Sequence, residues 1–224
     1  MTSPAASSLK MLGDLEGVPS AFAAARDGID ALLRDRGLRR TAPEATAESL
    51  LRGARASAVL EGSVSSLEEV RAGAGDEVAQ DAVRVSAELL SWGPTLSRSP
   101  LQVLARLHTV AAARSLPDDQ LGRPRDGESA TRLRAVSEVL AASEPFGSHN
   151  GLVARAVERL VLVSRGVDEK SLVVPELGHL ANRAAYESNL GAYRDGGPAG
   201  VHAWLLYAAE AYAGGAEASP LADA

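Results

Sequence analysis

The chain has 224 residues, of which 46% are hydrophobic, 23% are charged and only 4% are aromatic. Most of the apolar residues are Ala, Leu or Val, and the abundance of Ala and Leu favours helices over an all-β fold. The formal net charge of -6 argues against a nucleic-acid-binding protein, and the lack of cysteine excludes disulfides, Cys-ligated zinc and thiol catalysis.

The N-terminal third of the chain contains three segments with helical patterns. Residues 18–33 form the first, AFAAARDGIDALL being its periodic part. Thr41, followed by a Pro and a Glu, predicts the start of a second helix over residues 41–60. Ser65 and Glu68 have the spacing of a capping box, which predicts a short helix that ends near residue 72.

Two further helices are expected before the middle of the chain. Residues 76–90 are periodic, and Gly93-Pro94 is expected to end that helix. Ser99-Pro100 is typical of the start of the next one. The predicted apolar faces are Val78, Ala82, Val85 and Leu89 on the first helix, and Leu101, Leu104, Leu107 and His108 on the second.

The C-terminal half alternates between polar loops and apolar helices. Residues 115–128 are rich in Asp, Gly and Pro and are expected to form a loop. We expect helices over residues 129–142, 150–165 and 175–193. A last helix is expected to begin at a Pro and to cover residues 198–214.

These segments predict a single all-α domain of about eight helices over residues 19–214. Within it, residues 19–72 would be N-terminal helices and residues 76–214 the core. Residues 1–18 and 215–224 are expected to be flexible. The first residues lack the pattern of a secretion signal, and no run approaches the roughly 18 apolar residues of a membrane helix. We therefore expect a cytoplasmic protein with no membrane partner.

The most informative segment is residues 144–155, Glu-Pro-Phe-Gly-Ser-His-Asn-Gly-Leu-Val-Ala-Arg. Here a loop of small residues leads directly into a helix, whose free N–H groups and dipole attract anions such as phosphate. Phe146 would anchor the loop in the core. Arg155, one turn inside the helix, would face the same space.

This segment resembles the signature of the Fic (Fido) family, H-P-F-x-D/E-G-N-G-R-x-x-R. Pro145, Phe146, Asn150, Gly151 and Arg155 match it in register. The resemblance implies a Fic-like helical fold. It also implies ATP with Mg²⁺ as the cofactor. Family members transfer AMP, or another phosphate-containing group, from a nucleotide to a protein hydroxyl.

The likeness extends over roughly residues 45–212. Ser57, Glu61 and Gly62 fit the family's inhibitory motif, S/T-x-x-x-E-G/N. In the family, such a Glu pairs with the Arg at the position of Arg155 and fills the space of the nucleotide's γ-phosphate. Further pieces of the pattern, in the family's order, are His108 with Gly122-Arg123, then Arg183, Tyr186 and Leu190, and finally Trp204.

Four chemically important positions depart from the family pattern. Glu144 stands where the family has its catalytic His, and Ser148 where it has the acidic residue that binds Mg²⁺. His149 replaces the first Gly, and Leu152 replaces the Arg that holds nucleotide phosphate. Because Mg²⁺ prefers carboxylate oxygens, we expect no protein-held metal.

The candidate site residues follow from these matches and departures. Glu144 and His149 are the candidates for a substitute catalytic base; the alternatives are a solvated loop Glu and a surface His. The expected phosphate-binding residues are Gly147, Ser148, Asn150, Gly151 and Arg155. The expected inhibitory residues are Ser57, Glu61 and Gly62. The pair of Glu61 and Arg155 is either regulatory or structural, because an unpaired buried Arg is costly.

Three functions remain open at this point. The leading hypothesis is a Fic-like pseudoenzyme that lacks standard AMP transfer and binds a protein partner, a nucleotide or another phosphate ligand. The alternative is an active, divergent transferase that modifies a protein hydroxyl, with Glu144 or His149 moving the proton. The third is a helical interaction module without a ligand, whose Ala-rich helices would pack as a homodimer.

Overall fold

The computed structural model describes residues 12–34, 38–126 and 144–222, with residues 38–42 described by their backbone alone. All regular structure in these ranges is helical, which confirms the all-α prediction. The helices are α2 (Val18–Leu33), α3 (Leu38–Leu60), α4 (Leu67–Arg71), α5 (Glu77–Leu89), the 3-10 helix η1 (Leu90–Trp92), α6 (Gly93–Leu96), α7 (Pro100–Ala112), α10 (Asn150–Ser164), α11 (Pro175–Ala181), α12 (Arg183–Asp195) and α13 (Pro198–Glu217).

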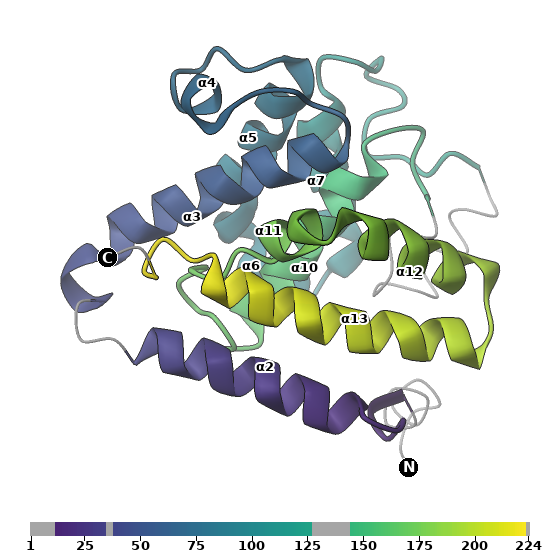
Figure 1. The fold of residues 1–224 in the computed structure, drawn as a ribbon. Coiled ribbons are helices and arrows are strands. Elements are labelled where there is room, and N and C mark those ends of the chain that lie inside the picture. Colours follow the sequence, from purple (N-terminus) through teal and green to yellow (C-terminus); the bar gives the residue numbers. More distant parts are fainter. Residues whose placement is uncertain (1–11, 35–37, 127–143, 223–224) are drawn as a thin grey trace.

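Helix α10 lies in the middle of the domain (Figure 1). It contacts α3, α5, α6, α7 and α11. Most of its apolar positions are buried, and Val153, Val157 and Leu160 belong to the largest hydrophobic cluster. On the other side of the domain, α13 lies between α2 and α12 (Figure 1). The N-terminus of α10 is thus held by packing on several sides.

The predicted starts of two N-terminal helices are wrong. Helix α3 begins at Leu38, so Thr41 lies inside it and is not its cap. Pro43 is the sixth residue of α3 and lies inside the helix, where it lacks the N–H that would bond to the carbonyl four residues before it. The capping box of α4 uses Ser66 with Glu69, one residue later than predicted. Ser65 instead accepts a hydrogen bond from the backbone N–H of Asp76, at 2.9 Å.

Helix ends in the rest of the chain also differ from the predictions. Helix α5 ends at Leu89, before Gly93, and Gly93 with its following Pro begins the short helix α6. Leu101 is 39% exposed and does not belong to the buried face of α7. The helix expected over residues 175–193 is broken at Asn182, whose side chain accepts a hydrogen bond from the N–H of Ala185. The last helix continues to Glu217, so the boundary expected at residue 215 lies inside it.

The remaining predicted helices begin and end close to where the sequence placed them. These are α2, α5, α7 and α10. The helix expected over residues 129–142 lies outside the described residues. In the described ranges, no helix combines the length and apolar character needed to cross a membrane.

Candidate functional site

The loop before α10 is pinned to the core by two residues. Phe146 donates its backbone N–H to Asn150 Oδ1 at 2.9 Å, and Asn150 Nδ2 donates back to the Phe146 carbonyl at 3.0 Å. The Phe146 ring is 1% exposed and stacks on His108, with 4.2 Å between ring centroids. His108 Nδ1 accepts a hydrogen bond from the N–H of Gly122 at 3.0 Å. The motif pieces around His108, Gly122 and Phe146 therefore lie together.

Arg155 is buried beneath this loop with three partners from other helices. Its guanidinium donates to Ser57 Oγ at 2.8 Å, to the Ser57 carbonyl at 3.1 Å, and to the Tyr186 hydroxyl at 2.9 Å. The fourth bond goes to Glu61 Oε1, at 2.7 Å. Burial alone would lower the pKa of Arg155, but Tyr186 and Glu61 outweigh burial and raise it. Arg155 is therefore a fixed, positively charged group.

The Glu61 carboxylate lies directly against the first turn of α10. A Cβ built on Gly151 would come 2.8 Å from Glu61 Cδ, which is closer than real atoms approach. Glu61 follows the C-terminus of α3, and its side chain stays 33% exposed. The N-terminus of a helix is where an anion is most favoured. Glu61 thus fills the place where the sequence predicts a phosphate, and its predicted pairing with Arg155 is confirmed.

At positions where the sequence differs from the family motif, the side chains have other partners. Glu144 forms an ion pair with Arg194 at 2.6 Å, and both side chains are nearly half exposed. Leu152 is 3% exposed and belongs to an apolar cluster, so its side chain does not face a ligand. Gly147 is exposed, with open space where a side chain would be. Gly62 ends the α3 segment with a φ of 97°, which favours glycine.

His149 and Ser148 contact each other and a residue from α5. Ser148 Oγ lies 2.6 Å from His149 Nδ1, and His149 Nε2 lies 3.1 Å from Asp81 Oδ2. Both ring nitrogens of His149 are therefore engaged by the protein. Any contact of the His149 ring nitrogens with a ligand would need one of these bonds to break. The alternative of a surface His does not fit a side chain that is only 15% exposed.

The residues present do not fit a tightly held Mg²⁺. Ser148, at the position of the family's acidic residue, offers only a hydroxyl that is already bonded to His149. Among the described residues there is no group of three or more His, Asp or Glu side chains that could hold a metal ion. We therefore derive no chemistry from a metal at this loop.

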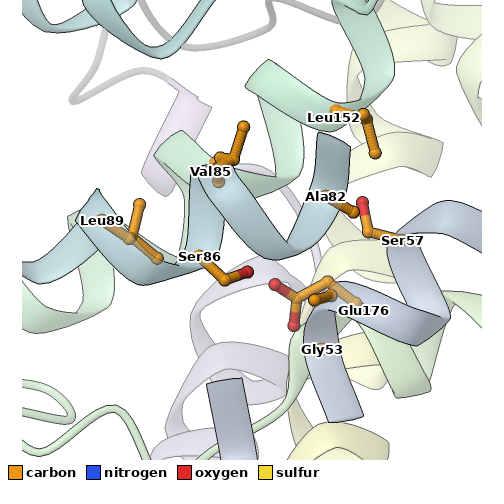
Figure 2. A pocket seen from close by; sticks show the side chains of 10 residues that line it. Gly53, Ser57, Ala82, Val85, Ser86, Leu89, Leu152 and Glu176 are labelled. Atoms are coloured by element: carbon orange, nitrogen blue, oxygen red, sulfur yellow. The ribbon is translucent and has the colours of Figure 1, made fainter. Parts of the chain in front are cut away.

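A pocket lies between α3, α5, α10 and α11, beneath Ser57 (Figure 2). Its lining includes Gly53, Ala82, Leu152 and Glu176. The space suits about one water molecule. This pocket is too small to admit a nucleotide.

Two buried networks that the sequence did not single out support α10. Arg159, one turn after Arg155, makes a bidentate pair with Glu176, at 3.1 and 2.8 Å. His179 Nε2 lies 2.9 Å from Glu158 Oε2, and its Nδ1 lies 2.9 Å from the Tyr207 hydroxyl. The sequence signal that could have indicated these networks is the presence of regularly spaced charged residues along an otherwise apolar helix. Asp81 was also missed, although it interrupts the apolar segment of α5.

No family model matches the chain, and no curated protein matches it at a significant level. The resemblance to the Fic family therefore rests on the motif residues of the sequence alone.

Proposed function

We propose that this chain is a Fic-like pseudoenzyme that binds a phosphate-bearing ligand at the N-terminus of α10, and that Glu61 closes this place in the free protein. One observation supports the proposal most directly. The Glu61 carboxylate lies against Gly151 and accepts a hydrogen bond from Arg155, where a ligand phosphate would meet the same groups.

The charges at the site favour an exchange of one anion for another. Arg155 keeps its bonds to Ser57 and Tyr186 when Glu61 leaves, so its guanidinium stays in place. The freed donor and the helix N-terminus then face a ligand oxygen. Because Glu61 is already 33% exposed, its carboxylate regains water as it moves outward.

The departures argue against AMP transfer by the usual route. The family's catalytic position holds Glu144, whose carboxylate is ion-paired with Arg194. Carboxylates are in general weaker proton acceptors than imidazoles. Leu152 supplies no cation for a second phosphate. Binding without transfer is the function that fits this set of residues.

Isothermal titration calorimetry of ATP, GTP and pyrophosphate, with and without Mg²⁺, tests the proposal. Glu61→Gly is expected to bind at least one of them about tenfold more tightly than the wild type, since the competing carboxylate is gone. The matched control is Glu169→Gly, which removes an exposed carboxylate from the turn after α10. That turn lies at the other end of the helix, about 22 Å away.

Three results would contradict the proposal. The first is that neither the wild type nor Glu61→Gly binds any of the anions although both unfold cooperatively. The second is that Glu169→Gly strengthens binding as much as Glu61→Gly does, which would mean that only net charge matters. The third is that Glu61→Gly transfers a nucleotide-derived group from ATP to a protein. The third result would leave ligand binding intact and would replace the pseudoenzyme by an active, divergent transferase.

A further inference from the structure

Ser148, His149 and Asp81 form a continuous chain of hydrogen bonds across two elements. Ser148 and His149 end the loop before α10, whereas Asp81 comes from the middle of α5. The Ser148 hydroxyl lies 2.6 Å from His149 Nδ1, and His149 Nε2 lies 3.1 Å from Asp81 Oδ2. A hydroxyl, an imidazole and a carboxylate in this order are the parts of an activated serine.

The protons in this chain are assigned by the carboxylate. The Asp81 side chain is only 2% exposed, and its other oxygen contacts the guanidinium of Arg84. An ionised carboxylate only accepts hydrogen bonds, so His149 donates its Nε2–H to Asp81. Nδ1 of the same neutral ring is then free of a proton and accepts the Ser148 O–H. This is the tautomer that a general base needs.

The backbone holds His149 in an unusual conformation. Its φ is 57°, in the left-handed region that non-glycine residues rarely occupy, at the residue that precedes the first turn of α10. Backbone strain of this kind persists only where surrounding contacts enforce it. The contacts that hold His149 here are those with Asp81 and Ser148. The titratable and charged groups near the ring are Asp81 and Arg84 of α5 and His108 of α7.

We propose that Ser148 is a nucleophile that takes the acyl group of a carboxylic ester, with His149 as its general base and Asp81 as a positioning residue. Ser148 Oγ bonds to the carbonyl carbon while its proton moves to His149 Nδ1. The bond between that carbon and the leaving oxygen then breaks, and the leaving alkoxide takes the proton from His149. Water releases the acyl group as a carboxylic acid by the same steps.

The first turn of α10 adds the stabilisation that such a step needs. The N–H groups at the start of an α-helix have no carbonyl partner within the helix, and Ser148 lies immediately before this turn. Donors in such a position stabilise the negative charge that develops on a carbonyl oxygen. The proposal shares the N-terminus of α10 with the phosphate-ligand proposal, but neither Glu61 nor Arg155 takes part in the acyl transfer, so each proposal can fail without the other.

A fluorophosphonate probe followed by peptide mass spectrometry tests the nucleophile. The Ser148 oxygen bonds to phosphorus, the phosphorus–fluorine bond breaks, and fluoride leaves. We expect labelling of the wild type at Ser148, and no label at that peptide in Ser148→Ala. The exposed Ser188 on α12 is the internal control and should stay unlabelled. Glu61→Gly is labelled in parallel, so that a closed Glu61 cannot hide the site.

Two variants test the roles of His149 and Asp81. His149→Asn keeps a residue that tolerates a positive φ but lacks the base, and should slow labelling about 100-fold. Asp81→Asn should slow it similarly, because the amide donates to Nε2 and leaves the proton on Nδ1. The pH profile of the labelling rate should also differ between the wild type and His149→Asn, because only the wild type has an imidazole beside Ser148.

The proposal is overturned if folded wild type and folded Glu61→Gly both stay unlabelled at Ser148. It is equally overturned if His149→Asn is labelled at the wild-type rate with the wild-type pH profile. Should Asp81→Asn label normally while His149→Asn does not, Asp81 has no positioning role and that part of the proposal fails. Tight anion binding with no labelling would separate this failure from that of the proposed function.

Discussion

Gly151→Ala is expected to have opposite effects on stability depending on residue 61. In the wild type, the added Cβ meets the Glu61 carboxylate, with Cδ only 2.8 Å away. The Glu61 side chain is flexible and one-third exposed, so it moves aside, and the contact that is lost is its hydrogen bond to Arg155. The remaining close atom, Arg155 Nη1 at 3.1 Å, is held by Tyr186 and has to shift by only a few tenths of an ångström.

The magnitude follows from what is lost and what is gained. A hydrogen bond between charged groups stabilises by about 1.5–3 kcal/mol, and the exposure of Glu61 places this one at the low end. Alanine is favoured over glycine inside a helix by about 0.5–1 kcal/mol. In the wild type, Gly151→Ala should therefore destabilise by about 1 kcal/mol. In a Glu61→Ala background no carboxylate is displaced, and the same change should stabilise by about 0.5 kcal/mol.

Urea unfolding of the four proteins of this double-mutant cycle, followed by circular dichroism, measures both numbers. The expected coupling between Gly151 and Glu61 is about 1–2 kcal/mol. Equal destabilisation by Gly151→Ala in both backgrounds would refute the reasoning, because the clash would then involve backbone and not the Glu61 carboxylate.

Two further variants probe buried charges near the site. Arg159→Met leaves Glu176 buried without its bidentate partner and should destabilise by about 3–5 kcal/mol in urea unfolding, most of which Arg159→Met with Glu176→Leu should restore; an effect below 1 kcal/mol would contradict this. Burial, helped by nearby His149, lowers the pKa of His108 to about 4 from 6.5. The unfolded chain therefore binds the extra proton first as pH falls from 6.5 to 4, and the free energy of unfolding drops by at most about 3 kcal/mol over that window. His108→Gln, compared with the wild type at pH 7 and 4.5, should lack this part of the pH dependence.

Helices were predictable from the sequence where local signals agree with packing. Helix α5 begins next to Asp76, where the sequence placed the start of that segment, and the Ser-Pro before α7 opens that helix, as predicted. Local signals failed where two positions compete for the same role. Ser66 with Glu69 forms the capping box that Ser65 with Glu68 also matches, because Ser65 binds the Asp76 backbone. Spacing alone cannot rank two such boxes.

The candidate site was predictable only as far as motif spacing reaches. The pairing of Glu61 with Arg155 follows from the resemblance, and the structure brings the two together across 94 positions of sequence. The link between His149 and Asp81 was not predictable, because nothing in the spacing of two residues 68 positions apart indicates a contact. Such contacts depend on how α5 packs against α10.

The two buried arginines of α10 allow the structural and regulatory interpretations of Glu61 to be compared within one helix. Arg155 and Arg159 are four residues apart, and each is 2% exposed. Glu176 binds Arg159 with both oxygens and its side chain is 7% exposed, so its removal would break two buried hydrogen bonds of Arg159, which would keep only its bonds to Ser49 and Ser171. Glu61 binds Arg155 through one oxygen, stays 33% exposed, and leaves behind an arginine that still has Ser57 and Tyr186. An ion pair with a purely structural role would be more stabilising if it were as buried and as bidentate as the pair of Glu176 with Arg159. The weaker, more exposed pair at the helix N-terminus is the one whose carboxylate can be exchanged for another anion, and this difference favours the regulatory interpretation.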